Sequence, residues 1–427
     1  MRGTRRRDRI AAAFAVAFGL ALAAGGAGAE PLVVRADILH TMGPAGTLRP
    51  GVVVVEDGRV VAVGGPDVAA PPGAEVLEAA VVTPGLVDTH SVVGLNGLYN
   101  VAADQDADEK SGWNQAALRA LDGFNPREPL LAWLVAHGVT TVQAGPGEAN
   151  PIGGLAGVCH THGDDVAAMT LRFPSALLLS LGEPPKATYA EAKQAPLTRM
   201  GTAALIRQAF VAAEAYGRAR SVDEGGGLLG RGKKKGGEPP ARDLGKEALL
   251  LALTGEIPTL VRAEREDDLH TAIRIGREFS LDLHLAGAAD GYLMARELWE
   301  AGVPVHVGPV MQRLGAIETL NASFENAAIL ADAGVPITFR SGFEAYVPKT
   351  RVVLFEAAVA AAYGLGTERA LRALTVDAAR TLGVADRVGS LEPGKLADLV
   401  LFGGDPFEYT TPVEAVIVEG EVAYRGE

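Results

Sequence analysis

Short runs of alternating apolar and polar residues mark both ends of the chain. These valine-rich runs occupy residues 31–40, 51–65, 74–82, 397–406 and 413–424. Asp57-Gly58 separates two apolar stretches near the start, and Glu419-Gly420 does the same near the end. An Asp-Gly pair between alternating apolar runs is a strong β-hairpin signal. The pattern therefore predicts β-strands at both ends of the chain.

The middle of the chain follows a different pattern. Apolar runs of four to six residues recur at 140–144, 258–263, 281–286, 303–307 and 336–339. Segments with helical spacing of apolar residues, such as 267–279 and 291–302, follow several of them. Strands that alternate with helices indicate a parallel sheet, and a stretch of about 300 residues favours a closed (β/α)8 TIM-type barrel. The alternative is a doubly wound open sheet, but no Gly-x-Gly-x-x-Gly signature supports it.

The first 29 residues are typical of a secretory signal peptide. Five arginines lie among residues 2–9, an apolar run covers 10–24, and Ala27-Gly28-Ala29 forms a small-x-small cleavage signature. The apolar run is short for a membrane anchor. We therefore expect cleavage after Ala29, a secreted or periplasmic location, and no membrane span in the mature protein.

Net charge and cysteine content narrow the classes of partner. The formal charge of the 427-residue chain is −13, and removal of five arginines and one aspartate with residues 1–29 would leave about −17. Nucleic acids and anionic membranes require a basic face, so neither is expected as a partner. Cys159 is the single cysteine and can form no disulfide within the chain. A small-molecule ligand or substrate is the expected partner, and a homo-oligomer is left open.

Residues 221–243 interrupt the alternation of strands and helices. The segment is rich in glycine, lysine and proline, and it includes Lys233-Lys234-Lys235. Such a composition cannot bury a core and predicts a flexible surface loop.

Two motifs resemble the amidohydrolase superfamily, in its secreted, imidazolonepropionase-like branch. They are "TPGLVDTH" at 83–90 and "VGSLEPGKLADLVLFGGDP" at 388–406. The resemblance covers nearly the whole mature chain. It implies a signal peptide at 1–29, a (β/α)8 barrel at 83–384, and one small composite β-sandwich built from 30–82 and 385–427.

The chemistry implied by the resemblance is metal-assisted hydrolysis of carbon–nitrogen bonds in amides, cyclic amides and dipeptides. In this family a His-x-His pair on the first barrel strand directs both imidazoles to one face. Later strands add a carboxylated lysine or an acid, two histidines and an aspartate. One or two metal ions then lower the pKa of a bound water and polarise the scissile carbonyl.

Four of the implied ligand positions hold other residues in this chain. The replacements are Val92, Arg262, Gly287 and Ser341. His90 is retained, and Glu264 stands where a second histidine of the fifth strand is expected, so these two are the catalytic candidates. A catalytic zinc normally keeps three protein ligands. We therefore predict no tightly bound metal at the barrel mouth and slow or absent hydrolysis.

One relocated metal site is a candidate. His160 and His162 are two residues apart on an expected strand, and Asp164 and Asp165 follow them. This spacing would suit one divalent ion such as zinc. The alternative, which we favour, is a hairpin that presents its imidazoles to solvent or to a neighbouring loop.

Several polar residues are predicted to line the pocket at the functional face of the barrel. They are Asp88, Arg262, Arg340, Ser341, Glu344 and Lys349. Two functions remain open from the sequence. One is a carbon–nitrogen hydrolase with a reduced or relocated metal site. The other is a non-catalytic extracytoplasmic protein that binds a ligand or serves a structural role on the same fold.

Overall fold

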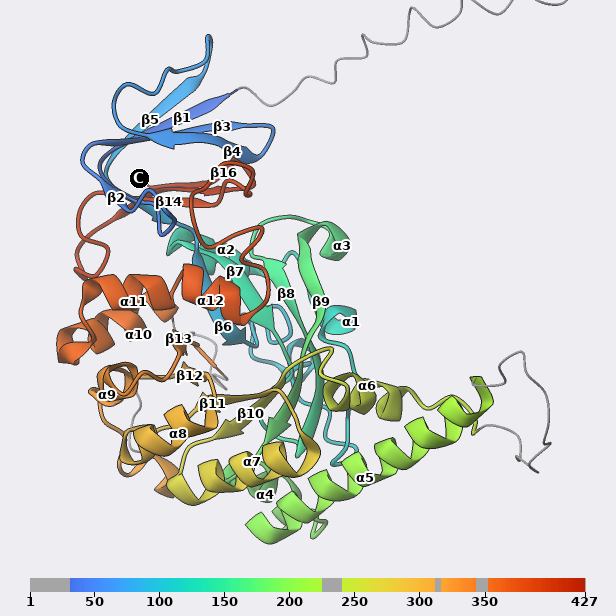
Figure 1. Cartoon of the computed structure of the whole chain (residues 1–427). Coiled ribbons are helices and arrows are strands. Elements are labelled where there is room, and N and C mark those ends of the chain that lie inside the picture. Colours follow the sequence, from blue (N-terminus) through green and yellow to red (C-terminus); the bar gives the residue numbers. More distant parts are fainter. Residues whose placement is uncertain (1–30, 225–239, 312–315, 343–351, 427) are drawn as a thin grey trace, which may run out of the picture.

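The computed structural model describes residues 31–224, 240–311, 316–342 and 352–426, and within them the chain forms two sheets (Figure 1). One sheet is built from the two ends of the chain. The other is an almost closed barrel of eight strands with helices on its outside. The predicted fold class, a barrel of the TIM type beside a composite β-structure, is confirmed.

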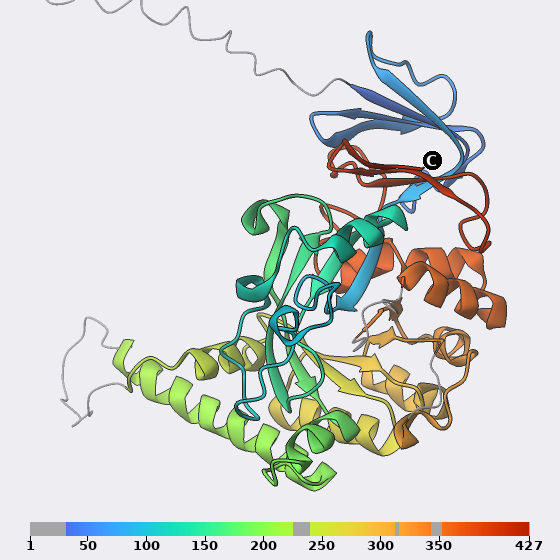
Figure 2. The same cartoon turned by 180° about the vertical axis from the view of Figure 1, so that it is seen from behind.

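The end sheet brings distant parts of the sequence side by side (Figure 2). Its strands are β1 (Leu32–His40), β2 (Thr47–Leu48), β3 (Gly51–Glu56), β4 (Arg59–Gly64), β5 (Glu75–Pro84), β14 (Leu399–Phe402), β15 (Val413–Val418) and β16 (Glu421–Arg425). The order is β16-β15-β14-β5-β1-β3-β4, and β2 pairs with β1. β14 lies antiparallel to β5, with Leu399 opposite Pro84. The C-terminal hairpin thus extends the sheet that the N-terminal strands begin.

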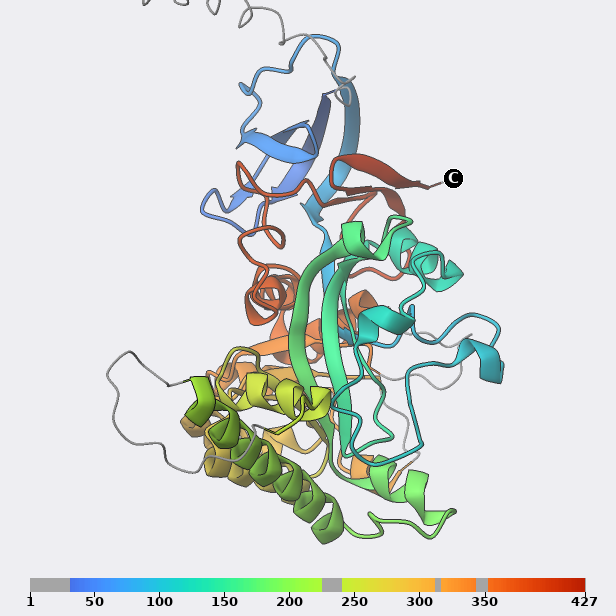
Figure 3. The same ribbon diagram turned by 90° about the vertical axis from the view of Figure 1, so that its right-hand side faces the viewer.

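The barrel strands follow one another in sequence order. They are β6 (Leu86–Ser91), β7 (Val139–Ala144), β8 (Ile152–His160), β9 (Thr170–Ser180), β10 (Thr259–Ala263), β11 (Leu283–Gly287), β12 (Val305–Val307) and β13 (Ile337–Phe339). A bridge between Ser91 and Gly342 joins the last strand to the first. β8 runs antiparallel to both β7 and β9, unlike the other barrel strands. Figure 3 shows the long β8 and β9 side by side along one wall.

Helices cover the outside of the barrel. The α-helices are α1 (Ala120–Gly123), α2 (Pro129–Ala136), α3 (Val166–Met169), α4 (Glu183–Ala190), α5 (Arg199–Glu224), α6 (Leu244–Leu253), α7 (Glu266–Phe279), α8 (Ala295–Ala301), α9 (Asn326–Asp332), α10 (Val353–Ala360), α11 (Thr367–Ala373) and α12 (Val376–Thr381). Shorter helical turns are η1 (Ala102–Asp104), η2 (Gly291–Met294), η3 (Ile317–Thr319) and the π-turn η5 (Ala361–Leu365). α7 illustrates how the sequence specifies them. Acids occupy its first turn, where the helix dipole favours them, and its buried face carries Leu269, Ile273 and Phe279.

The inside of the barrel is packed rather than hollow. Small and medium side chains from four neighbouring strands form one buried cluster of Ala156, Ala176, Leu178, Leu260 and Ala286. Successive side chains of a strand point to opposite faces, so Arg262 shares the inner face with Leu260 and lies nearer the strand's C-terminal end. The buried apolar cluster therefore ends where the polar residues of the barrel mouth begin.

The segment predicted as a loop at 221–243 begins later than expected, and its predicted end agrees with the start of α6 at Leu244. Residues 221–224 are the last turn of α5, and Asp243 caps α6 by accepting a hydrogen bond from the Lys246 amide at 3.0 Å. Residues 225–239 lie outside the described residues. In the part of the chain that the structure describes, no helix has the length and apolar character needed to span a membrane.

Candidate active site

The polar residues at the barrel mouth come from strands that end there. Asp88 and His90 lie on β6, Arg262 is on β10, and Glu264 follows β10 directly. Arg340 and Ser341 follow β13. In TIM barrels the C-terminal ends of the strands form the functional face. The structure therefore gathers the predicted residues Asp88, His90, Arg262, Glu264, Arg340 and Ser341 at that face.

Arg262 lies at the centre of a cluster of buried carboxylates. Its Nε is 2.9 Å from Oε2 of Glu148, and its Nη2 is 3.5 Å from Oε1 of Glu264. The same Nη2 forms an ion pair with Glu318 of η3, and Nη1 donates to the Leu181 carbonyl at 3.3 Å. Only 9% of Arg262 is exposed. Its guanidinium therefore binds carboxylates from three separate segments away from solvent.

Arg340 extends the cluster to His90. Its Nη1 donates to Oε1 of Glu148 at 2.9 Å and to Nδ1 of His90 at 3.2 Å. Its Nε donates to the Gly308 carbonyl at 3.0 Å. Glu148 thus bridges the two guanidiniums.

The contacts of His90 fix its tautomer as a neutral imidazole. Nδ1 accepts from Arg340, so the proton must be on Nε2, which donates to the Pro146 carbonyl at 3.1 Å. Burial and then the nearby Arg340 charge lower the pKa of His90 to about 4. At neutral pH His90 is therefore uncharged and both of its ring nitrogens are engaged.

Two of the three carboxylates around Arg262, Glu148 and Glu264, have opposite pKa shifts. Burial raises the pKa of Glu148, but the charges of Arg262 and Arg340 outweigh it and hold the pKa at about 2. Burial raises the pKa of Glu264 to about 7 because the same arginines are farther away and two other carboxylates oppose ionisation. Glu264 is the buried acid of this cluster whose proton can exchange near neutral pH.

Ser341, which stands where the resemblance implies a metal ligand, hydrogen-bonds to Asp88. The Ser341 amide donates to Oδ1 of Asp88 at 3.0 Å, its hydroxyl hydrogen-bonds to Oδ2, and the His90 amide donates to Oδ1 at 3.1 Å. Burial raises the pKa of Asp88 to about 6 against these hydrogen bonds. Asp88 and Ser341 therefore lock β6 to β13 where the barrel closes.

The positions where the resemblance implies metal ligands make other contacts in the structure. Val92 packs in an apolar cluster with Leu95, Ala107 and Ala120. Gly287 has a φ of +90°, and a Cβ there would collide with the Glu264 carboxylate. Arg262 places a cation among the remaining acids. Across the described ranges, no group of three or more His, Cys, Asp or Glu side chains is placed so that it could hold a metal ion, and the three glutamates that meet here surround Arg262 instead.

The two histidines of the candidate relocated site, His160 and His162, lie near the end sheet. His160 ends β8 at the opposite end of the barrel from His90, beside the end sheet, where its Nε2 lies 3.0 Å from Oδ2 of Asp398. His162 lies beyond the strand, 40% exposed, with Nε2 3.7 Å from Glu421. The strand ends at His160, so only His160 lies on β8, and its Nδ1 is also 3.7 Å from Oε1 of Glu419.

A second buried histidine pair lies inside the barrel. His284 on β11 and His306 on β12 approach each other, with Nδ1 of His284 3.2 Å from Nε2 of His306. Burial lowers the pKa of both rings. Neighbouring parallel strands place them together, but no further His, Cys, Asp or Glu completes a metal site in the described residues.

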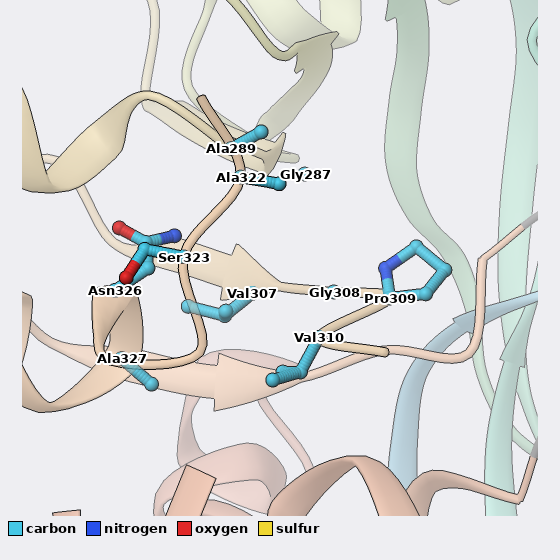
Figure 4. A pocket seen from close by; sticks show the side chains of 10 residues that line it. All are labelled: Gly287, Ala289, Val307, Gly308, Pro309, Val310, Ala322, Ser323, Asn326 and Ala327. Atoms are coloured by element: carbon cyan, nitrogen blue, oxygen red, sulfur yellow. The ribbon is translucent and has the colours of Figure 1, made fainter. Parts of the chain in front are cut away.

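A small pocket adjoins the cluster at the ends of β11 and β12 (Figure 4). It is lined by Gly287, Ala289, Val307, Gly308, Pro309, Val310, Ala322, Ser323, Asn326 and Ala327. Its volume is about 10 Å³, room for about one water molecule. Glu344 and Lys349, which were predicted to line the mouth, lie outside the described residues.

Two central residues were missed by the sequence reasoning. Glu148 belongs to the loop after β7, and Glu318 belongs to η3. Neither has a motif partner nearby in sequence. An unpaired Arg262 at an inward strand position was the signal that could have prompted a search for buried acids, because a buried guanidinium needs partners.

Comparisons with known proteins place this architecture in a family. A model described as the amidohydrolase family matches residues 290–423. The crystal structure of an amidohydrolase from Thermotoga maritima MSB8 superposes with a TM-score of 0.83 at 32% identity, covering 92% of this chain and 100% of that one. The chain belongs to the amidohydrolase family.

Two further relatives match at the level of sequence. Amidohydrolase tasK of Hapsidospora irregularis is 27% identical over 378 residues, which cover 83% of this chain. An imidazolonepropionase of Porphyromonas gingivalis is 33% identical over 119 residues, 25% of this chain. The matched segments span 38% of tasK and 27% of the imidazolonepropionase.

Proposed function

We propose that this protein is a hydrolase of carbon–nitrogen bonds in small amides or cyclic amides, with a degenerate metal site and reduced or absent metal-dependent activity. The observation that carries the proposal is the Arg262 guanidinium, ion-paired with Glu148, Glu264 and Glu318 at the C-terminal end of the barrel. A fixed positive charge in that place repels a divalent ion. Family membership supports the bond type, and the similarity to imidazolonepropionases favours a cyclic amide.

In this proposal Glu264 is the general base. Without a metal, water keeps a pKa near about 15.7 instead of about 7, so a protein group must take its proton as it attacks the carbonyl. A carboxylate with a pKa of about 7 is suited to that task near neutral pH. Arg262 and Arg340 limit the rise of this pKa and orient the carboxylate. Turnover should therefore be slow and should increase as the pH rises through about 7.

Metal analysis combined with a substrate panel tests the proposal. The panel contains five- and six-membered cyclic amides and N-acyl amino acids, each with chelator and with added Zn²⁺ or Mn²⁺. We expect slow turnover that chelator does not change. Glu264→Gln should lower the rate by about 10²-fold or more, whereas Glu266→Gln, an exposed acid two residues later, should leave it unchanged.

Opposite results have definite meanings. Near-stoichiometric zinc, together with activity that chelator abolishes, would contradict the degenerate site. Binding of panel compounds without turnover would favour the non-catalytic alternative.

We also propose that the chain is exported and cleaved after Ala29. The arginine-rich start, the apolar run and the small-x-small signature support this. N-terminal sequencing of the exported protein should begin at Glu30. Recovery of residues 2–9 in that protein would overturn the proposal.

A further inference from the structure

Three carboxylates at the barrel mouth converge on one side chain. Glu148 comes from the loop after β7, Glu264 from the end of β10 and Glu318 from η3, so three distant segments meet at Arg262. The side chains of Glu264 and Glu318 are only 3% and 2% exposed. Ionised acids this deeply buried need a cation close by.

Arg262 distributes its contacts over the whole guanidinium. Nε forms an ion pair with Glu148 at 2.9 Å without hydrogen-bond geometry, Nη2 pairs with Glu264 and Glu318, and Nη1 donates to the Leu181 carbonyl. A planar fork with five donors can serve several acceptors in fixed directions, as a compact ammonium cannot. The geometry therefore uses guanidinium shape as well as positive charge.

The backbone makes room for this arrangement at two glycines. A Cβ on Gly182, whose φ is +86°, would lie 3.1 Å from Nη1 of Arg262 and close to Glu318. A Cβ on Gly287, whose φ is +90°, would collide with Glu264. Both backbone conformations favour glycine. Two independent loops are thus shaped around the same cluster.

We propose that Arg262 is the resident cation of the barrel mouth, which assembles Glu148, Glu264 and Glu318 around a guanidinium in place of a bound ion. Arg262 is a positioning residue in this role. The proposal concerns assembly of the site, and it stands whether or not a carbon–nitrogen bond is hydrolysed there. It implies that the vacated position in an alanine variant selects a small planar guanidinium ion.

Chemical rescue tests this directly. Arg262→Ala removes two methylenes and the guanidinium, which ethylguanidinium replaces. We expect Arg262→Ala to lower the unfolding midpoint by roughly 5 °C or more. Millimolar ethylguanidinium should restore a large part of it, because a ligand at ten times its Kd raises the folded-to-unfolded ratio about elevenfold.

Three controls test whether the rescue depends on the charge of the added cation, on its planar shape and on the vacated Arg262 position. Ethylammonium has the same charge without the fork and should not rescue Arg262→Ala. Wild type and Arg265→Ala, which lacks an exposed arginine paired with Asp267, should show no response to ethylguanidinium. Hydrogen exchange should quicken at 145–150 and 316–321 in Arg262→Ala and slow again with ethylguanidinium.

Substitutions that retain the long side chain cover the case in which Arg262→Ala does not fold. Arg262→Lys should be more stable than Arg262→Met, since it keeps a cation, and less stable than wild type, since it lacks the fork. Equal stability of Arg262→Met and wild type would overturn the proposal, as would equal rescue by ethylammonium. Failure of the rescue would overturn this proposal and leave the hydrolysis test unaffected, whereas a stoichiometric metal held at the mouth of the wild-type protein would contradict both proposals.

Discussion

Two buried histidines at opposite ends of the barrel show how a single neighbour sets the charge of an imidazole. His90 at the mouth faces the Arg340 guanidinium, and burial and that charge both lower its pKa, to about 4. His160 at the base faces Asp398, 3.0 Å away. Burial lowers its pKa too, but Asp398 and Glu419 outweigh burial and Arg387, and the net shift is upward. Burial alone therefore does not decide the charge of a histidine.

The partners also differ in what they hold together. At the mouth, Arg340 connects β13 to β6 and to the loop that carries Glu148. At the base, Asp398 accepts from His160 through Oδ2 and from the Glu419 amide through Oδ1, at 2.9 Å. Asp398 therefore joins the barrel to the end sheet at a position where two turns of that sheet meet β8.

Of the changes proposed for the two histidine sites, removal of the Asp398 carboxylate should lower the free energy of unfolding most. Asp398→Ala leaves the His160 ring buried without its acceptor and frees the Glu419 amide. We expect a loss of about 3–5 kcal/mol in the free energy of unfolding. Denaturant titration measures this, and a change below about 1 kcal/mol would show that the joint contributes little.

The second-largest effect should be a loss of stability in acid, caused by protonation of His90. Its pKa is about 4 in the folded protein and about 6.5 when unfolded, so the unfolded state binds the proton more readily. The stability that the neutral ring contributes is present above pH 6.5 and is lost as the pH falls through about 4, by about 3 kcal/mol in total. The acid slope of unfolding free energy should flatten in His90→Gln, and an unchanged slope would contradict this assignment.

His160 should give the opposite and smaller pH dependence, because burial and Asp398 partly cancel. Its raised folded pKa means that its contribution is complete below about pH 6.5 and is lost as the pH rises through the folded value. NMR titration of labelled histidines should find His160 titrating above 6.5. In Asp398→Asn that pKa should fall below 6.5, since burial then dominates, and a pKa that stays high would mean another group sets it.

His162 gives the smallest expected effect. Its ring is 40% exposed and lies 3.7 Å from Glu421, which is itself 81% exposed. Glu421→Ala should change the free energy of unfolding by less than about 0.5 kcal/mol. His160 and His162 are only two residues apart in the sequence. A large effect of Asp398→Ala and a small effect of Glu421→Ala on the free energy of unfolding would therefore show that burial of the ion pair, and not its position in the sequence, decides its contribution.

The sequence predicted the scaffold better than the site. Alternating apolar runs and two motifs were sufficient for a barrel beside a composite sheet, because those signals are local. The replacement of expected ligands by Val92 and Arg262 could also be read from the sequence. The partners of Arg262 could not, because Glu148 and Glu318 reach it only after the barrel closes. For the same reason the sequence offered a metal pair as one candidate role for His160 and could not identify its acceptor, Asp398, which lies 238 residues away.

The antiparallel course of β8 has a consequence for how the chain can vary in length. The loop with Glu148 precedes this strand at the mouth, and His160 ends it at the base, so nine residues, about 30 Å of extended chain, connect the two charged sites. One inserted residue within the strand would turn every following side chain to the other face. His160 would then point away from Asp398 while Glu148 stayed in place. We therefore expect natural length variation to avoid residues 152–160 and to fall in the turns on either side.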